Sequence, residues 1–287
     1  MCKSSHYMKY LNAHITVVAL FTCLFIAIVP EGHAQVQIAP KALYMDDVNR
    51  TGRMVLRNSS DGPVEVSIDL IFGYPDSDDN GRVFMNFPDP VPDDEPSAAE
   101  WVRVYPRNLA LPPGERQTIR FAARPPGSLP DGEYWARPAI TTRPVRQDTE
   151  SQAKRVSARI NIAKRMVLAL NYRHRDVNTG IDIEHASAEV TETGIHIEAT
   201  ANRTGNAAFL GNVTLKVRTK NGRLIKEIQR KTAVYHSRTR LFNLGLDDFS
   251  SGNYFAEIGY NTEREGEKPG DIIQAEAVSE TVRFTVP

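Results

Sequence analysis

The sequence predicts an all-β protein with two β-sandwich domains in tandem. Short runs of alternating apolar and polar residues recur along the chain, and proline and glycine separate these runs throughout. No segment of useful length repeats its apolar residues with the period of a helix. The chain has 287 residues, which is enough for two domains of typical size behind a short N-terminal segment.

Residues 1–34 have the features of a cleaved secretory signal peptide. Lys3 and Lys9 precede an apolar run from Ile15 to Val29, and small residues surround His33, where a signal peptidase would cut. The apolar run has 15 residues, fewer than the roughly 20 that span a bilayer as a helix. We therefore expect an exported chain whose mature form is not inserted into a membrane.

Composition argues against several classes of function. Cys2 and Cys23 are the two cysteines of the sequence, and both lie in the predicted signal, so the mature chain is expected to have no disulfide. Without the signal 33 basic and 34 acidic residues remain, which indicates neither nucleic acid nor an anionic membrane surface as a partner. The four remaining histidines lack metal-ligand spacing, and no nucleophile elbow or phosphate-binding glycine loop is present. The sequence therefore predicts no enzymatic activity and no cofactor.

The alternating runs define the expected strands. In the first half we expect strands at 36–45, 53–58, 64–74, 101–105, 117–123, 134–141 and 156–171. In the second half we expect strands at 194–201, 212–219, 224–229, 232–236, 240–244, 253–260 and 272–286. The dipeptide Asn221-Gly222 lies between two of these runs and predicts a two-residue hairpin turn.

A short internal repeat indicates that the two halves share one architecture. LPDGEY, which ends at Tyr134, matches FSSGNY, which ends at Tyr254. Both segments are typical of the tyrosine corner of immunoglobulin-like sandwiches, in which the hydroxyl bonds to the backbone just upstream. The alternative is two ordinary turns that each precede a strand tyrosine. The turn-rich segment after the last long strand of the first half places the domains at 35–173 and 174–287.

The stretch from Trp101 to Ile140 has a specific order of strands and turns. The run WVRVY is followed by the turn LPPG, the run QTIRFAA and then LPDGEY. This order closely resembles the first domain of periplasmic pilus-assembly chaperones, the PapD-like family. The resemblance covers 35–173 and is looser over the second domain. It implies a periplasmic location and a secreted pilin-like subunit as partner, and it leaves open whether an outer-membrane usher is a second partner.

The segment 156–162 is the candidate for binding such a subunit. A polar loop precedes it. Its even-numbered residues alternate with polar ones and so share one face of a strand: Val156, Ala158, Ile160 and Ile162. In PapD-like chaperones the corresponding strand lends alternating apolar side chains to an incomplete pilin sandwich. The alternative is that these four side chains fill the core of their own domain.

Basic residues near this strand are candidates for holding the carboxylate at the C-terminus of the subunit. Residues 143–175 contain nine Lys or Arg and two acidic residues. Family chaperones anchor the carboxylate with an arginine on the first strand and a lysine on the last strand of the first domain. Arg165 matches that lysine best, and Lys164 is the alternative. Ala42 stands in place of the arginine, so the neighbouring Lys41 substitutes only if a bulge or shifted register turns it inward, and is otherwise a solvated lysine.

An acidic segment resembles the opening of a calcium-binding loop, with Asp76, Asp78 and Asn80 at the ligand spacing. The pattern breaks at its last position, where Phe87 replaces the bidentate glutamate. We therefore expect a solvated hairpin tip, inserted relative to the PapD-like family, and no metal site.

Two hypotheses remain for the whole chain. The first is a periplasmic chaperone that caps a secreted pilus or fimbrial subunit by donating the strand at 156–162. The second is a structural or adhesive protein of the surface or periplasm, built of two immunoglobulin-like modules. In the second hypothesis the strand is interior and the basic residues are solvated, so the two hypotheses differ in whether a client binds.

Overall fold

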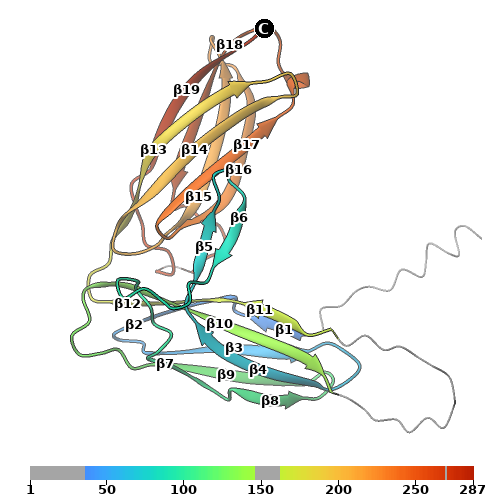
Figure 1. The fold of residues 1–287 in the computed structure, drawn as a ribbon, viewed down its shortest axis with the longest axis vertical. Helices are drawn as coiled ribbons and strands as arrows, with labels where there is room; N and C mark the ends of the chain where they lie inside the picture. Colours follow the sequence, from blue (N-terminus) through green and yellow to red (C-terminus); the bar gives the residue numbers. More distant parts are fainter. Residues whose placement is uncertain (1–35, 146–161, 269) are drawn as a thin grey trace, which may run out of the picture. The chain divides into compact units, whose positions relative to one another are not determined.

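The computed structural model describes residues 36–145, 162–268 and 270–287, and in these ranges the chain is a succession of β-strands (Figure 1). Four sheets form two sandwiches, each with its own hydrophobic core, which confirms the predicted fold class. The predicted signal peptide lies outside the described residues. Across the described ranges, no helix has the length and apolar character needed to cross a bilayer.

The first sandwich consists of a four-stranded and a six-stranded sheet. The first sheet has the order β1 (Val36–Ala39), β3 (Thr51–Asn58), β9 (Arg116–Ala123) and β7 (Val102–Tyr105). The second has the order β2 (Ala42–Asp46), β12 (Ala169–His174), β10 (Gly132–Pro144), β4 (Val64–Ile71) and β8 (Asn108–Leu111), and β11 (Lys164–Val167) also pairs with β10. Alternating residues of both sheets fill the core, as Met54, Ile68, Ile119, Phe121 and Ile140 do.

The second sandwich consists of a three-stranded and a four-stranded sheet. The three-stranded sheet has the order β13 (Thr179–Val190), β14 (Ile195–Gly205) and β17 (Ser237–Leu244). The other has the order β16 (Leu224–Val234), β15 (Phe209–Thr219), β18 (Gly252–Asn261) and β19 (Val278–Val286), and a 3₁₀ turn, η1 (Leu246–Asp248), precedes β18. A separate two-stranded hairpin, β5 (Tyr74–Ser77) with β6 (Val83–Asn86), follows β4.

Both predicted tyrosine corners are present. The Tyr134 hydroxyl donates to the Pro130 carbonyl at 2.8 Å, and the Tyr254 hydroxyl donates to the Ser250 carbonyl at 2.8 Å. In each corner a glycine lies two residues before the tyrosine, with φ of 157° at Gly132 and 153° at Gly252, a region that favours glycine. The two sandwiches therefore share this device down to the backbone conformation.

Several expected boundaries were wrong. The run 36–45 is two strands in different sheets, because Pro40 has no N–H and cannot continue a ladder. The runs 224–229 and 232–236 form one strand, β16. The last strand starts at Val278, since Ile272 packs in a separate aromatic cluster.

The Asn221-Gly222 hairpin is present, but its loop has three residues. The Thr219 N–H bonds to the Arg223 carbonyl at 2.9 Å and the Gly222 N–H to the Thr219 carbonyl at 2.9 Å. Gly222 has a φ of 82°, so it occupies the left-handed position that follows a type I turn and forms a bulge. Gly222 is therefore the third residue of the loop, whereas a two-residue turn would make it the second.

Strand β13 was not predicted, because a bulge hides its alternation. Ile183 pairs with Ala201 and His185 pairs with Thr200, which leaves Glu184 as an extra residue. Inward residues are therefore odd-numbered before the bulge, at Ile181, and even-numbered after it, at Ala186. A period of two counted along the sequence fails across this point.

Loss of either corner hydroxyl is expected to destabilise the protein. Tyr134→Phe removes one hydrogen bond of a turn between sheets, and Tyr254→Phe removes two, because the Tyr254 hydroxyl also accepts the Ser250 N–H at 3.1 Å. We expect the free energy of unfolding to fall by at least about 0.5 to 1.5 kcal/mol in each case. Urea unfolding followed by circular dichroism measures this. Tyr105→Phe is the control, since Tyr105 is 75% exposed and should leave the midpoint unchanged. Equal midpoints for all three variants would contradict a structural role for the corners.

Candidate functional site

Strand β11 is the described end of the candidate subunit-binding strand, and it lies at a sheet edge. Lys164–Val167 pair with β10 in antiparallel register, and no other strand of the described ranges pairs with β11. After Leu168, whose N–H bonds to the Pro138 carbonyl at 3.0 Å, the chain enters β12, which β2 covers in parallel on its other side. The open edge therefore belongs to β11, the strand that follows the segment 156–162 in the sequence.

The pairing register assigns a face to each residue of β11. Met166 lies opposite Ile140, on the side of the first core, and it packs against that core with Leu168. Lys164 lies opposite the buried Thr142, so it belongs to the same side by alternation. Arg165 and Val167 point to the other face. An extended strand would carry the even-numbered candidate residues on the face of Met166.

Of the four candidate strand residues, Ile162 is described and the other three are not. Val156, Ala158 and Ile160 lie outside the described residues. Ile162 is 62% exposed and lies two positions before β11, whose Lys164 and Arg165 are also exposed. Its side chain therefore does not fill the core of its own domain.

The three candidate anchors for a carboxylate do not lie on one face. Lys164 and Arg165 are both exposed and point to opposite faces of β11. Lys41 is exposed at the break between β1 and β2, and its carbonyl accepts the Ala169 N–H at 3.3 Å. Since Ala42 pairs with Ala169, Lys41 is opposite residue 168, three residues and about 10 Å along the strand from Arg165.

Two arginines of the predicted basic strip are already paired. Arg173 Nε lies 3.0 Å from Glu133 Oε2, and Arg175 Nη1 lies 3.3 Å from Asp131 Oδ1. The strip of 143–175 is therefore not a uniform cationic surface. Within the described part of that range, the free cations nearest the open edge are Lys164 and Arg165.

Glu133 is a buried carboxylate that the sequence analysis missed. It is 1% exposed, and Oε1 accepts hydrogen bonds from Asn171 Nδ2 at 2.9 Å, Trp135 Nε1 at 3.1 Å and the Ala208 N–H at 3.3 Å. Arg173 binds its other oxygen. A buried charge is tolerated when it is paired and hydrogen-bonded in this way. Glu133 lies just before the expected strand 134–141, within the LPDGEY corner, and no local signal marked it as buried.

The same contacts join the two sandwiches. Arg173 donates from Nη1 to the Gly270 carbonyl at 2.6 Å and from Nη2 to the Asp271 carbonyl at 2.5 Å. Beside it lies an aromatic cluster, in which Trp135 meets Tyr235 edge to face with ring centroids 4.5 Å apart. These contacts therefore hold β12, the strand that follows β11, in place.

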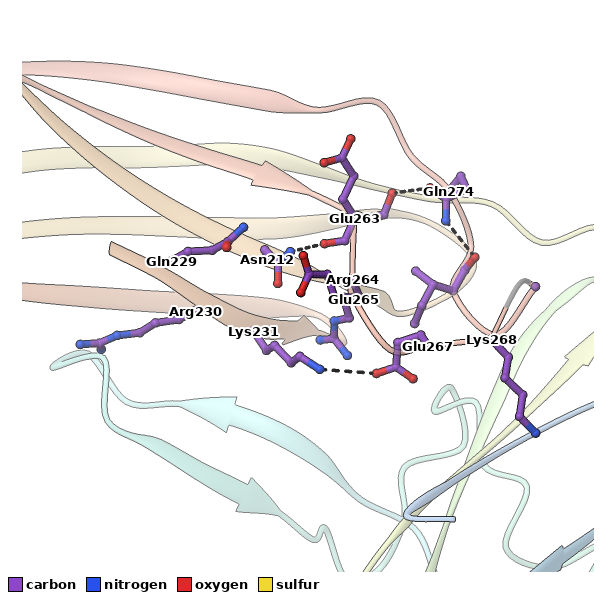
Figure 2. A pocket seen from close by; sticks show the side chains of 13 residues that line it. Asn212, Gln229, Arg230, Lys231, Glu263, Arg264, Glu265, Glu267, Lys268 and Gln274 are labelled. Atoms are coloured by element: carbon purple, nitrogen blue, oxygen red, sulfur yellow. Dashed lines mark hydrogen bonds and ion pairs between the residues drawn. The ribbon is translucent and has the colours of Figure 1, made fainter. Parts of the chain in front are cut away.

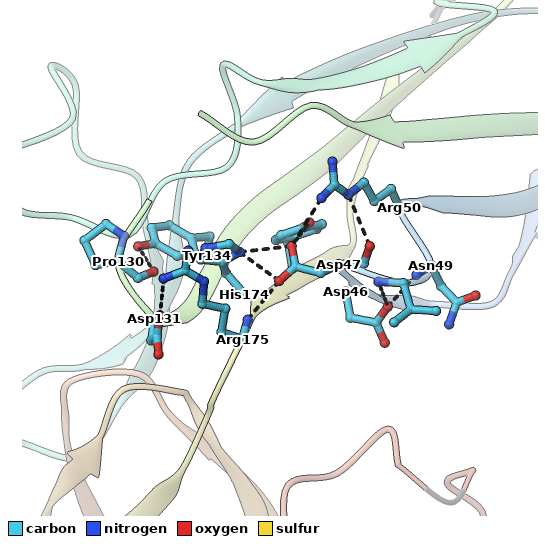
Figure 3. A network of polar contacts seen from close by, with 11 residues as sticks. Asp46, Asp47, Asn49, Arg50, Pro130, Asp131, Tyr134, His174 and Arg175 are labelled. Carbon is cyan, nitrogen blue, oxygen red and sulfur yellow. Dashed lines mark hydrogen bonds and ion pairs between the residues drawn. The ribbon is translucent and has the colours of Figure 1, made fainter. Parts of the chain in front are cut away.

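Asp47 is the centre of a second polar network (Figure 3). Its carboxylate accepts hydrogen bonds from the Tyr172 hydroxyl at 2.7 Å and the Arg175 N–H at 3.0 Å, and it lies 2.9 Å from His174 Nδ1. Partial burial acts to raise the pKa of Asp47, but the hydrogen bonds from Tyr172, His174 and Arg175 outweigh it and lower the pKa to about 2. The network holds the end of β12 to the loop after β2.

The acidic segment at Asp76, Asp78 and Asn80 forms the tip of the β5–β6 hairpin, as predicted. Asp78 Oδ1 accepts the N–H groups of Asn80 at 3.0 Å and Arg82 at 2.8 Å, which closes the turn. Asp76 accepts the Ser77 N–H at 2.8 Å. The described residues contain no group of three His, Cys, Asp or Glu side chains placed to hold a metal ion.

A polar cavity of about 650 Å³ lies in the second sandwich (Figure 2). Charges of both signs line it, namely Arg230, Lys231, Glu263, Arg264, Glu265, Glu267 and Lys268. Lys231 Nζ lies 3.8 Å from Glu267 Oε1, and Arg264 donates to the Gly211 carbonyl at 3.0 Å. Because charges of both signs are mixed along its lining, the cavity favours no single class of ligand.

Comparison with known proteins finds similarity among solved structures. No family model and no curated protein matches the chain. A chain from the chaperone–tip adhesin pre-assembly complex of the archaic chaperone-usher Csu pili of Acinetobacter baumannii has 12% identity and a TM-score of 0.45, over 86% of this chain and 98% of that chain. A Pseudomonas aeruginosa chaperone has 15% identity and a TM-score of 0.43, over 88% and 100%.

A third similar structure is a chain from the complex of the Salmonella enterica SafA pilin with the SafB chaperone. It has 14% identity and a TM-score of 0.42, over 86% of this chain and 96% of that chain. All three structures contain a chaperone. Since the identities are low and the TM-scores are under 0.5, the function of this chain has to be inferred from its own residues.

Removal of the Glu133 carboxylate is expected to be severely destabilising. Glu133→Ala removes the acceptor of the buried Asn171, Trp135 and Ala208 donors and the partner of Arg173, and breaking a buried pair in this way costs about 3 to 5 kcal/mol. Urea unfolding of the variant measures the loss. Glu65→Ala, which removes an exposed carboxylate on β4, is the control and should cost little. A Glu133→Ala variant as stable as this control would show that the buried pair contributes nothing.

Acid sensitivity is expected to depend on Asp47. Its pKa of about 2 in the folded protein lies below the unfolded value of 3.8, so its contribution to stability is present above about pH 4 and is lost as the pH falls toward 2. Allowing for solvent screening, the parent should lose roughly 1 to 2 kcal/mol more than Asp47→Asn over this interval. Urea titrations at several pH values test this, with Asp61→Asn as an exposed control. Parallel curves for parent and Asp47→Asn would contradict it.

Proposed function

We propose that this chain is a periplasmic chaperone that holds a secreted pilin-like subunit by lending it an edge strand, the segment 156–162 with its continuation β11. The observation that carries the proposal is the free edge of β11, which the predicted donor segment enters directly. The resemblance of the stretch from Trp101 to Ile140 to PapD-like chaperones supports the class of partner. The role proposed is binding, without catalysis.

The physical basis is strand addition to an incomplete sandwich. A subunit that lacks one strand exposes an apolar groove and unpaired backbone groups, and an added strand satisfies both. Ile162 is 62% exposed and is available for such a groove. Burial of each large aliphatic side chain contributes about 1.5 to 3 kcal/mol, so several alternating residues suffice for stable binding. The anchored β12 would hold the donor strand in position while the subunit binds.

The carboxylate at the end of the subunit is proposed to bind Arg165 or Lys164. Both side chains are exposed, and both residues lie on β11, beside the open edge along which the subunit would bind. Lys164 has the advantage that it lies on the face of Met166, the face on which the donor residues would lie. A charge-assisted contact contributes about 1.5 to 3 kcal/mol, which sets the register of the added strand. Lys41 lies about 10 Å along the strand and would act as an auxiliary cation.

The location follows from the same hypothesis. Export by the predicted signal at 1–34 would place the chain in the periplasm, where pilin-like subunits await assembly. An outer-membrane usher, the site to which such subunits are delivered, is proposed as a second partner on the resemblance alone.

Substitution of the donor strand is expected to abolish retention of the subunit. Ile160→Asp and Ile162→Asp each direct a carboxylate into an apolar groove, which costs several kcal/mol and should lower affinity by more than about 100-fold. Affinity purification from the native periplasm with mass spectrometry of bound proteins measures retention. Val48→Asp is the matched control, because Val48 is 89% exposed and lies outside the strand. Circular dichroism checks that each variant is folded.

Three outcomes separate the hypotheses. A small exported subunit bound to the parent and to Val48→Asp, but absent from the two strand variants, supports donation of the strand. Full retention of the subunit by Ile160→Asp would contradict donation of the strand and would indicate that the client binds to another surface. If no client binds to the parent or to any variant, the structural or adhesive module is favoured. Ala42, which stands in place of the anchoring arginine of the family, is the reason to test this alternative.

A further inference from the structure

The exposed apolar surface of the described residues is concentrated on one segment that the proposed function does not use. Of ten large apolar side chains that are exposed, five lie within nine residues at exposures of 39–45%: Val83, Phe84, Met85, Phe87 and Val91. Four of them are on or next to β6. Single exposed apolar residues need no explanation, but a contiguous patch marks an interaction surface.

The backbone of β6 also presents a free edge. Its partner β5 faces the second sandwich, where the Thr239 N–H donates to Ser77 Oγ at 2.8 Å. Within the described ranges no strand other than β5 pairs with β6. The Asp78 N–H binds the Arg82 carbonyl at 3.1 Å, and alternation then directs the backbone groups of Val83 and Met85 away from β5. An apolar edge of this kind is a template for another strand.

The side chains along this edge form one continuous face. Val83 and Met85 lie opposite Ser77 and Pro75 of β5, and Phe87 continues the alternation. The Phe87 ring lies directly against Gly73, where an added Cβ would come within 2.4 Å of the ring. This close approach holds the Phe87 ring in line with the other two side chains.

We propose that β6 pairs with β6 of a second copy of this chain, antiparallel about a twofold axis through Met85. In this register Met85 lies opposite its own equivalent, and Val83 of each copy lies opposite Phe87 of the other. Six apolar side chains then form a single strip across the axis. An isologous contact of this type is the usual arrangement in a dimer with twofold symmetry.

A further residue fits the same register. Pro88, which has no N–H, falls opposite Arg82 at a position that makes no hydrogen bond between the strands, so its missing donor costs nothing. The edge is therefore complementary to itself in backbone and in apolar side chains. This inference does not depend on the proposed function.

Concentration-dependent sedimentation of the full chain tests the proposal. The parent is expected to show a monomer–dimer equilibrium. Met85→Lys places two ammonium groups across the axis and should raise the dissociation constant by more than about tenfold. Leu224→Lys is the matched control, since Leu224 is 42% exposed on a different strand and should leave the equilibrium unchanged. A parent that stays monomeric at every concentration overturns the proposal, and so does a dimer that survives Met85→Lys.

A crosslinking experiment tests the register independently of stability. With Cys2 and Cys23 changed to Ser, Met85→Cys brings two thiols to a hydrogen-bonded antiparallel pair, whose Cα atoms are about 5.5 Å apart and within disulfide range. Phe84→Cys is the control, because Phe84 lies opposite Asn86 of the second copy. Rapid oxidation to a dimer is expected for Met85→Cys and not for Phe84→Cys. Equal rates of disulfide formation in the two variants would overturn the pairing. So would a Met85→Cys variant that crosslinks to another protein and not to a second copy of itself.

Discussion

The buried carboxylate of Glu133 is the interaction on which the strands around the candidate site depend. It lies on β10, accepts hydrogen bonds from β12 through Asn171 and Arg173, and reaches the second sandwich through the Ala208 N–H. An unpaired charge in this position would be prohibitive, so these donors must stay where they are for the fold to persist. The pair therefore sets the position of β12 against β10. It also positions β11, which precedes β12 in the chain and is separated from it by Leu168 alone.

This arrangement separates a rigid end of the strand from an available one. At β12 the chain is covered by β10 on one side and β2 on the other, while Asp47 holds its last residues. At β11 the chain keeps the partner β10 and has an open side within the described ranges. A donor strand needs both properties, because it must offer unpaired backbone groups and must also remain in place when a partner pulls on it.

The two free edges differ in chemistry, which gives them different proposed partners. The edge at β11 has Lys164 and Arg165 beside a core-facing methionine, which suits an extended segment that ends in a carboxylate. The edge at β6 has apolar side chains on one face, which suits a copy of itself.

The sequence by itself determined the all-β class, the two tyrosine corners and most strands of the second half, because these depend on local alternation and turn chemistry. It also predicted the hairpin tip at Asp78. Contacts in the tertiary structure decide which sheet each half of the 36–45 run joins, where a bulge reverses the alternation at Glu184, and that Arg173 pairs with the buried Glu133. These features depend on contacts between residues far apart in the chain, such as the 40 positions that separate Glu133 from Arg173, and no local pattern records them.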